Sequence, residues 1–298
     1  MKPIYLQFFL FAILINTLNI STRAQDFNNS KNNPPYWRDT IIDRPILVED
    51  IKGTTFDPDG RAVYFVDYTN WSEKKVCPIM ISHYGNEKWN SPDTISSTYN
   101  LKCADPFLSP DGSKLFFSNF TSSPRTICVM ERVNKKWSEP HRLNDLINPS
   151  GSSVGQVYAT LTDRGTLYFT RGWGDIYCSK LVNGQYSIPE KLPDAINTTE
   201  FPEWDACIAR DESFIIFCSK RSPSQGSSDL YISYKKNGKW MLAINLGIYI
   251  NSGFWEGLPG ISPDGKYLFF MSDKSGSSKV YQVELKPLLN SLKKNPPK

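Results

Sequence analysis

The hydrophobic positions of this chain follow one pattern that recurs five times. In each copy an apolar stretch leads into a tight polar turn, and the turn leads into a dense strand of aromatic and aliphatic residues. Three of the turns are Pro-Asp-Gly, in which Pro presets the first turn position and Gly accepts a positive φ. The turns end at Gly60, Gly112, Gly165, Ser213 and Gly265. This spacing predicts a structural repeat of about 50 residues.

Each copy also contains a third strand and the start of a fourth. The third strands are predicted at residues 79–82, 127–130, 176–179, 230–233 and 280–283. A polar turn with Asn or Gly then precedes the aromatic residue that opens a fourth strand: Trp89, Trp137, Tyr186 and Trp240. We expect these aromatic residues to pack between neighbouring units. The fifth copy has no such residue, but Trp37 and residues 41–48 stand before the first copy at the matching spacing.

This displacement predicts a closed ring. Four-stranded units repeated in a line would leave two exposed edges, whereas radial repetition protects them. We therefore predict an all-β fold: a five-bladed β-propeller of four-stranded blades over residues 36–286, in which the N-terminal strand completes the last blade. The alternative is a β-sandwich or a solenoid in which the spacing is coincidental. A sixth turn motif is not found in the sequence, which argues against a six-bladed ring.

The ends of the chain differ from the repeats. Residues 1–24 show the order of a signal peptide: Lys2, an apolar run at residues 4–18, and the small residues Thr22 and Ala24 before the cleavage point. The run is shorter than a bilayer-spanning helix, although an uncleaved anchor is the alternative. We expect residues 25–35 to form a flexible N-terminal segment and residues 287–298 to form a polar C-terminal tail.

The repeat residues carry a family resemblance. The pattern Ser262-Pro263-Asp264-Gly265-Lys266, and the Asp-Ile-Tyr and Asp-Leu-Tyr sequences that begin at Asp175 and Asp229, resemble the TolB-type, WD40-like propeller repeat. The resemblance covers nearly all of the chain after the signal peptide. It implies the fold rather than a function, because the chain lacks the N-terminal α/β domain of TolB and has five units rather than six. The chain also resembles small exported proteins of Bacteroidetes that consist only of such repeats.

Composition narrows the chemistry. Two His residues and a formal charge of +4 argue against a His-rich metal site and a nucleic-acid-binding surface. Neither His83 nor His141 belongs to a Ser/His/Asp or Cys/His arrangement, so we expect no metal and no cofactor. The six Cys residues permit disulfides in an exported protein, but buried Cys also serves as a small hydrophobic residue, and both readings stay open.

Candidate ligand-binding residues lie where the innermost strand of each blade begins, which we call the top face. The loops there contain Trp71, Trp173, Trp204 and Trp255. These four residues could form an aromatic platform for a ligand, or they could fill the gaps between blades.

Polar residues accompany the tryptophans at this face. Glu203, Glu256, Gln156 and Asp105 lie at related positions, and Asp50 lies nearby in its own blade. Close carboxylates could bind a cation or carry out acid/base chemistry on a glycoside. The alternative is that each one accepts backbone hydrogen bonds where a strand begins.

The absence of a catalytic constellation beside an aromatic-rich rim favours one function. We expect an exported, monomeric, non-catalytic binding module that holds a protein or glycan on its top face. It would reside in the periplasm, at the cell surface or outside a Gram-negative cell. The alternative is a carbohydrate-active enzyme, a glycosidase or lyase, that uses the carboxylates at the channel mouth.

Overall fold

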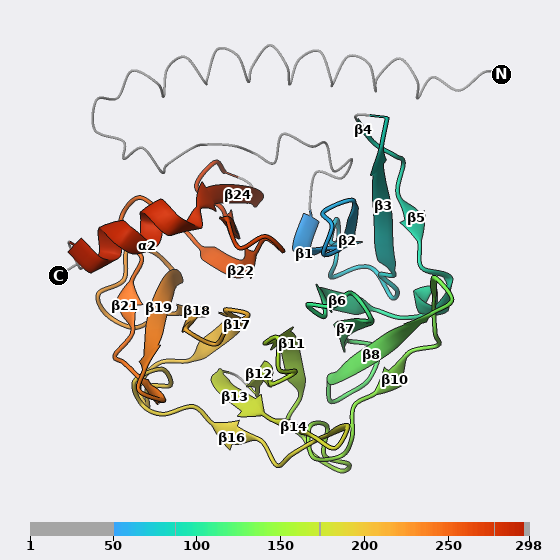
Figure 1. The fold of residues 1–298 in the computed structure, drawn as a ribbon, viewed down its shortest axis with the longest axis horizontal. Helices are drawn as coiled ribbons and strands as arrows, with labels where there is room; N and C mark the ends of the chain where they lie inside the picture. Colours follow the sequence, from blue (N-terminus) through green and yellow to red (C-terminus); the bar gives the residue numbers. More distant parts are fainter. Residues whose placement is uncertain (1–50, 87, 173, 277, 295–298) are drawn as a thin grey trace.

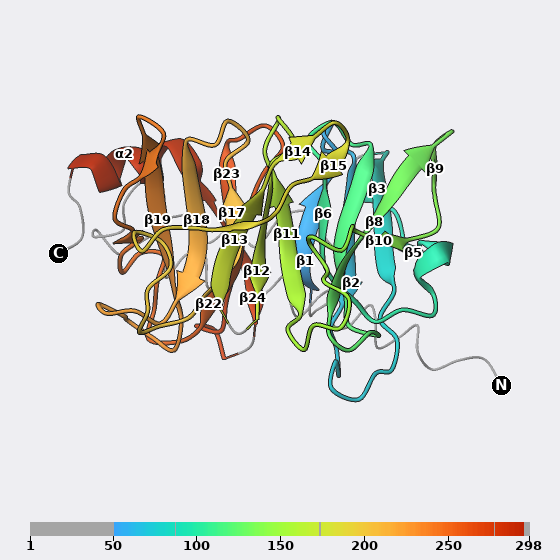
Figure 2. The ribbon, with the colours of Figure 1, turned by 90° about the horizontal axis from the view of Figure 1, so that it is seen from below.

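The computed structural model describes residues 51–86, 88–172, 174–276 and 278–294. Five small antiparallel sheets surround a central axis (Figure 1), and their strands run between two opposite faces of the ring (Figure 2). The predicted five-bladed β-propeller is therefore confirmed. The top face lies along the lower edge of Figure 2. The opposite face, which we call the turn face, carries the five tight turns.

The blades follow one another in chain order, and neighbouring strands within a blade are antiparallel. The innermost strands of blades 1 to 5 are β1 (Ile51–Phe56), β6 (Cys103–Leu108), β11 (Gln156–Leu161), β17 (Glu203–Ile208) and β22 (Glu256–Ile261). The second strands are β2 (Ala62–Asp67), β7 (Lys114–Asn119), β12 (Leu167–Arg171), β18 (Phe214–Ser219) and β23 (Tyr267–Ser272). The third strands are β3 (Ile79–Gly85), β8 (Thr126–Val133), β13 (Asp175–Ser179), β19 (Asp229–Lys236) and β24 (Lys279–Glu284).

Short strand pieces lie at the outside of blades 1 to 4. They are β4 (Lys88–Trp89), β5 (Asp93–Thr94), β9 (Lys136–Trp137), β10 (His141–Arg142), β14 (Leu181–Val182), β15 (Gln185–Tyr186), β16 (Glu190–Lys191), β20 (Lys239–Trp240) and β21 (Ile244–Asn245). One turn of 3₁₀ helix, η1 (Ser96–Thr98), follows β5. Of the aromatic residues in these pieces, Trp137, Tyr186 and Trp240 pack against the preceding blade, whereas Trp89 packs against strands of its own blade. Trp137 meets the edge of Tyr64 at 5.8 Å between ring centroids, and Trp240 meets Tyr168 at 6.4 Å.

A repeated asparagine fixes the loops that leave blades 2, 3 and 4 at the top face. The Asn197 side chain accepts a hydrogen bond from the Ile176 N–H at 2.8 Å and donates to the carbonyls of Ile176 and Leu192, both at 2.9 Å. Asn148 and Asn251 make the same pair of bonds to Ile127 and Leu230. These asparagines substitute for a missing ladder partner at the start of the third strand, where an unpaired backbone group would be costly. The sequence shows them as three Ile-Asn pairs.

The fourth turn differs from its expected register. The left-handed position is occupied by Gly60, Gly112, Gly165 and Gly265 in the other turns, but by Glu212 (φ 62°) in blade 4 rather than by Ser213. A non-glycine residue there costs conformational energy. Its side chain has compensating contacts, because the Glu212 carboxylate accepts a hydrogen bond from the Tyr168 hydroxyl and pairs with Lys235 at 3.1 Å.

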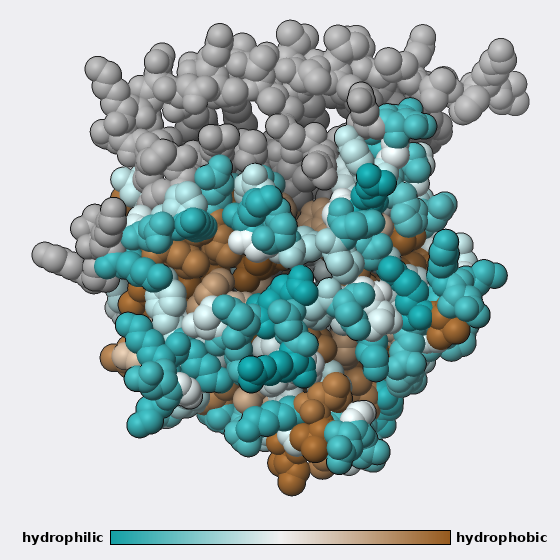
Figure 3. All heavy atoms as spheres, viewed as in Figure 1, coloured by the Kyte–Doolittle hydropathy of each residue, from teal (hydrophilic) through white to brown (hydrophobic). Residues whose placement is uncertain are grey.

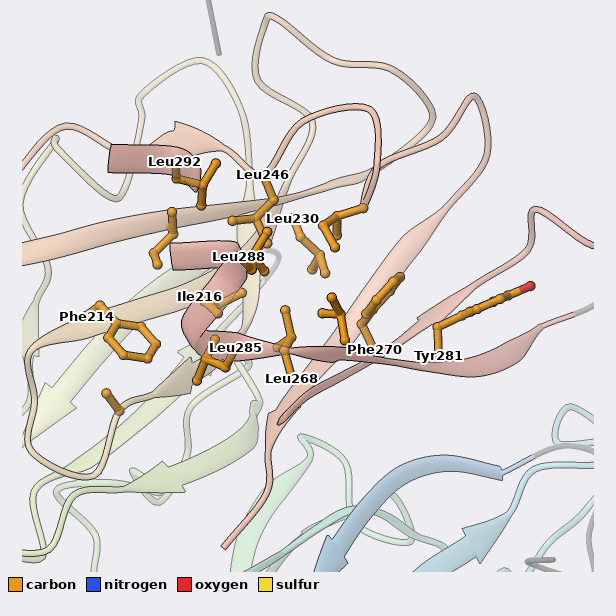
Figure 4. Close-up of a cluster of buried hydrophobic side chains, with 14 of the residues drawn as sticks. Phe214, Ile216, Leu230, Leu246, Leu268, Phe270, Tyr281, Leu285, Leu288 and Leu292 are labelled. Atoms are coloured by element: carbon orange, nitrogen blue, oxygen red, sulfur yellow. The ribbon is translucent and has the colours of Figure 1, made fainter. Parts of the chain in front are cut away.

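The C-terminal residues correct one expectation. Residues 285–294, most of which were expected in a polar tail, form the helix α2 (Leu285–Lys294). Leu285, Leu288 and Leu292 are buried and join the apolar core of blades 4 and 5 (Figure 4). Their spacing of three and four residues places them on one helix face. The helix covers part of the turn face (Figure 2).

Ring closure stays a prediction. Trp37 and residues 41–48 lie outside the described residues, as do the signal-peptide residues 1–24. Within the described chain, blade 5 contains β22, β23 and β24, and β1 of blade 1 lies beside this sheet (Figure 1). No helix among residues 51–294 is long and apolar enough to cross a membrane.

The asparagine anchors predict a specific loss of stability. Asn197→Ala would leave the Ile176 N–H without a partner inside the protein, whereas the Ile176 carbonyl would keep the Leu192 N–H as its donor. We expect the free energy of unfolding to fall by roughly 1–3 kcal/mol, which is the cost of one unsatisfied buried group. Urea denaturation measures this change. The neighbouring exposed variant Thr199→Ala is the control and should change stability by less than about 0.5 kcal/mol. Equal effects of the two variants would contradict the anchoring role.

Ring closure predicts the effect of an N-terminal deletion. Removal of residues 25–48 should expose the outer edge of β24, so that the protein aggregates or unfolds without cooperativity. Light scattering and thermal melting would show both effects. Removal of residues 25–35 alone is the control and should leave the melting curve unchanged. A soluble protein with a normal melting curve after the longer deletion would rule out the closing strand.

Candidate functional site

The carboxylates at the top face anchor the chain. Glu203 is fully buried at the start of β17. Its carboxylate accepts hydrogen bonds from the Thr198 N–H at 2.8 Å and the Ser219 hydroxyl at 3.0 Å, and pairs with Arg221 at 2.9 Å. Glu203 therefore accepts hydrogen bonds where its strand begins, as the alternative to a cation-binding or acid/base role describes.

Glu256 repeats this arrangement in blade 5. It is fully buried and accepts hydrogen bonds from the Ser252 N–H at 2.9 Å and the Ser272 hydroxyl at 2.6 Å. Gln156 is also buried, and its amide donates to the Val154 carbonyl at 2.9 Å. Each side chain therefore closes the loop that precedes its own innermost strand. None of the three is among the described residues that line the central cavity.

A β-bulge at the same place in every innermost strand shapes the central channel. One residue of each bulge has a left-handed backbone: Gly53, Asp105, Tyr158, Asp205 and Leu258, with φ between 49° and 61°. A bulge redirects the side chain of its extra residue. All of these residues except Asp205 line a cavity of about 50 Å³ at the axis.

Among the predicted site residues that the structure describes, Asp105 alone lines this cavity. Its carboxylate accepts hydrogen bonds from the Ser118 hydroxyl at 2.9 Å and the Tyr68 hydroxyl at 3.4 Å. Burial raises the pKa of Asp105 to about 6, although these hydrogen bonds oppose the shift. Asp105 therefore titrates close to neutral pH.

Asp205 is a second channel carboxyl that sequence reasoning did not single out. Burial, followed by the charge of Asp105, raises the pKa of Asp205 well above its ordinary value. Its partners are the Leu258 backbone and the Cys218 thiol, whose sulfur lies 3.9 Å from the carboxylate. A carboxyl whose charge disfavours the ionisation of a second carboxyl is a feature shared with the acid and base pairs of hydrolytic enzymes. Residues 105 and 205 occupy the same position of the bulge in their strands, and this shared position is the sequence signal that could have identified Asp205.

The channel offers little room around these carboxyls. The Tyr158 hydroxyl reaches from blade 3 to the Pro259 carbonyl of blade 5, at 2.7 Å. A cavity of about 50 Å³ holds a few water molecules. Asp105 therefore lines a narrow space at the axis, and Asp205 is not among the residues that line it.

A single arginine closes the channel at the turn face. Arg210 of blade 4 donates to the Asp163 carboxylate at 2.7 Å, to the Pro263 carbonyl at 3.2 Å and to the Pro110 carbonyl at 3.4 Å. These acceptors belong to the turns of blades 3, 5 and 2. A second cavity of about 60 Å³ lies behind the Arg210 side chain. Polar side chains cover the centre of this face in Figure 3.

The predicted rim tryptophans are partly buried. Trp71 stacks on Tyr68 with 4.7 Å between ring centroids, and the Lys102 ammonium lies 4.4 Å from its ring. Trp204 lies within β17 and packs against the core of blades 4 and 5. These contacts are those of residues that fill gaps between blades. Trp173 lies outside the described residues.

Trp255 stands immediately before β22 and is partly exposed. A Cβ atom on Gly257 would lie 2.2 Å from the Trp255 indole, so the ring rests against the backbone of that glycine. Glycine is required here because any side chain would displace the ring. The structure thus places Trp255 differently from Trp71 and Trp204, on a glycine support at the top face.

Other apolar side chains are far more exposed than the tryptophans. In the top-face loops they are Val76, Tyr99, Leu146, Val154, Ile248, Tyr249 and Phe254. Phe254 is 53% exposed and Ile248 is 66% exposed. The repeat pattern does not identify them, because it marks core positions and does not show which loop side chains turn outward.

Metal and disulfide chemistry receive no support from the described part of the chain. Within residues 51–294, no group of three His, Cys, Asp or Glu side chains is arranged to hold a metal ion. All six Cys residues are free thiols, and five of them are buried. Burial raises the pKa of Cys207 to about 12, which keeps this thiol protonated and unreactive.

Comparisons with known proteins support the fold. No protein-family model and no curated protein matches the sequence. Among solved structures, TolB from Acinetobacter baumannii has a TM-score of 0.50 at 19% identity, covering 79% of this chain and 55% of TolB. The α-L-arabinofuranosidase from Lactobacillus brevis has a TM-score of 0.54 at 12% identity, covering 78% and 88% of the two chains. The endo-arabinase from Bacteroides thetaiotaomicron has a TM-score of 0.53 at 13% identity, covering 79% and 94%. The chain therefore has a TolB-like propeller fold.

The channel carboxyl predicts an unusual dependence of stability on pH. The pKa of Asp105 is about 6 in the folded protein and about 4 in an unfolded chain. The contribution of protonated Asp105 to the free energy of unfolding is fully present below pH 4 and is lost as the pH rises through 6. Asp105→Asn should therefore gain roughly 2–3 kcal/mol relative to wild type between pH 4 and pH 8, measured by urea denaturation.

Asp111→Asn provides the control of opposite sign. Burial opposes ionisation of Asp111, but hydrogen bonds from Ser109 and Ser113 outweigh it and lower its pKa. That variant should lose stability relative to wild type over the same pH range. If the difference between Asp105→Asn and wild type does not change with pH, Asp105 is not protonated in the folded protein.

Proposed function

We propose that this protein is a non-catalytic binding module that holds a protein or glycan on its top face. One observation carries the proposal: exposed apolar side chains occur in loops of the top face, whereas Asp105 and Asp205, the acidic pair described near the axis, lie on bulges of the innermost strands. Exposed apolar groups on a folded surface often mark interaction sites. Tyr99, Ile248 and Phe254 are each more than half exposed.

The loops that carry these residues are held in place. The loop between β21 and β22 is fixed in its middle by Asn251 and at its C-terminal end by Glu256. The backbones of β6, β11, β17 and β22 also bond to the preceding blade, as in the Glu256 N–H to Ser228 carbonyl bond of 2.9 Å. A surface that is already ordered loses less entropy when it binds a partner. This rigidity supports a recognition role.

The second candidate is a glycosidase. The paired environments of Asp105 and Asp205 favour it, because hydrolysis of glycosides uses one protonated and one ionised carboxyl. The names of two structural neighbours, an arabinofuranosidase and an endo-arabinase, are compatible with it. The cavity of about 50 Å³ argues against it, since a sugar must reach both carboxyls. We therefore rank binding above catalysis.

The proposed location and assembly follow from the same features. The order of residues 1–24 supports export, to the periplasm or to the cell surface or medium of a Gram-negative bacterium. We propose a monomer, because the ring buries its own strands and its recognition loops face outward.

A paired set of surface variants tests the top face. The top-face variant combines Tyr99→Ser, Leu146→Ser and Ile248→Ser. The control combines Val133→Ser, Val182→Ser and Leu242→Ser, which are exposed apolar residues towards the turn face. Residues 25–298 would be immobilised and exposed to cell-envelope proteins and to soluble polysaccharides. We expect the top-face variant to lose at least about tenfold in affinity for the retained partner and the control to keep it.

Two results would contradict the proposal. One is a loss of binding in the turn-face variant alone. The other is release of reducing sugar from a polysaccharide by wild type, abolished by Asp105→Asn. That second result would favour the glycosidase, because removal of an essential acid or base costs about 10²–10⁴ in rate.

A further inference from the structure

One interblade loop at the top face has no charged residue. The loops before the innermost strands of blades 2, 3 and 4 contain Lys102, Asp145, and Asp194 with Glu200, respectively. The loop between β21 and β22, residues 246–255, contains none. It instead concentrates exposed Ile248, Tyr249 and Phe254 with partly exposed Trp255. A ligand recognised here would meet aromatic and aliphatic surface without a fixed charge.

A second uncharged segment contacts this loop. Residues 222–228 consist of Ser, Pro, Gln and Gly. The Ser227 N–H donates to the Phe254 carbonyl at 2.9 Å, and a Cβ on Gly226 would overlap that carbonyl. The two segments are therefore in close contact. Ser224, Gln225 and Ser227 are exposed in the segment that lies against Phe254.

The chemistry of this surface indicates a class of ligand. Sugar rings present C–H faces, which pack on aromatic side chains, and hydroxyls, which exchange hydrogen bonds with Ser and Gln side chains. A neutral saccharide also needs no compensating charge. A nucleic acid or an acidic polysaccharide would require Lys or Arg at the contact. Protein interfaces are enriched in Arg, which both segments lack.

We propose that residues 246–255 and 222–228 form a binding surface for a neutral polysaccharide chain, with Phe254 and Trp255 as its aromatic contacts. This inference rests on the proposed binding function and narrows its ligand. The surface lies in loops at the junction of blades 4 and 5, and none of its residues lines the central cavity. Recognition there would not involve Asp105 or Asp205.

Affinity electrophoresis of residues 25–298 tests the proposal. The gels would contain arabinan, xylan, mannan or dextran as neutral probes and polygalacturonate as the anionic comparison. We expect at least one neutral polysaccharide to retard the wild type and polygalacturonate to have no effect. Phe254→Ala and Trp255→Ala should each raise the dissociation constant about tenfold or more. Leu242→Ala, which removes an exposed apolar side chain towards the turn face, should leave it unchanged.

Gly257→Ala is the most specific variant, because it keeps every aromatic residue and displaces the Trp255 ring. It should weaken binding as strongly as Trp255→Ala. Thermal melting of each variant separates loss of binding from loss of folding, and Phe254→Ala provides an exposed site at which folding is not at risk.

Three outcomes would overturn the inference: no retardation by any neutral probe, retardation by polygalacturonate alone, or retardation that survives both Phe254→Ala and Trp255→Ala. The proposed binding function would stand in these cases if the variant of Tyr99, Leu146 and Ile248 still lost its partner. It would fail separately if wild type hydrolysed a polysaccharide.

Discussion

The convergence of five innermost strands on one axis is the constraint on which this structure depends. Each strand bulges at the same position and turns one residue toward its neighbours, and four of these five residues line the central cavity. Tyr158 spans the axis, and Arg210 joins four turns at the turn face. The cavity of about 50 Å³ has room for a few water molecules. The exposed apolar side chains lie outside this cavity, in the loops of the faces.

The same buried polar groups that close the blades also order the loops of the top face. Asn251 and Glu256 are fully satisfied by backbone and hydroxyl partners, and between them lies the loop that exposes Phe254. Buried polar groups of this kind fix a single conformation, because every alternative leaves one of them unpaired. The stability of the blades and the shape of the top face therefore have one origin.

The sequence predicted features that repeat and missed those that depend on a single blade. The spacing of the turns and the aromatic residues such as Trp137 and Trp240 identified five blades, because burial between blades imposes the same residue type in each unit. Glu212 occupies the left-handed turn position in blade 4. Its contacts with Tyr168 and Lys235 come from outside its own turn, so the turn pattern does not predict them. Asp205 was missed for the same reason, since its environment is set by residues 13 and 53 positions away.

Proteins with different names share this fold. This agrees with the distinction between the strands, which repeat in every blade, and the side chains that occur in a single blade. A TolB protein, an arabinofuranosidase and an endo-arabinase share the architecture at identities of 12–19%, so the blades alone do not specify an activity. In this chain the acid pair satisfies one requirement of a glycosidase, a protonated carboxyl near an ionisable one. The Tyr158 side chain, which reaches from blade 3 to the Pro259 carbonyl of blade 5, reduces the space at the axis beside Asp105. Because Asp105 and Tyr158 belong to adjacent bulges of one ring, the geometry of the axis limits substrate access to this carboxyl. The loops of the top face carry the exposed apolar side chains on which the proposed binding function depends.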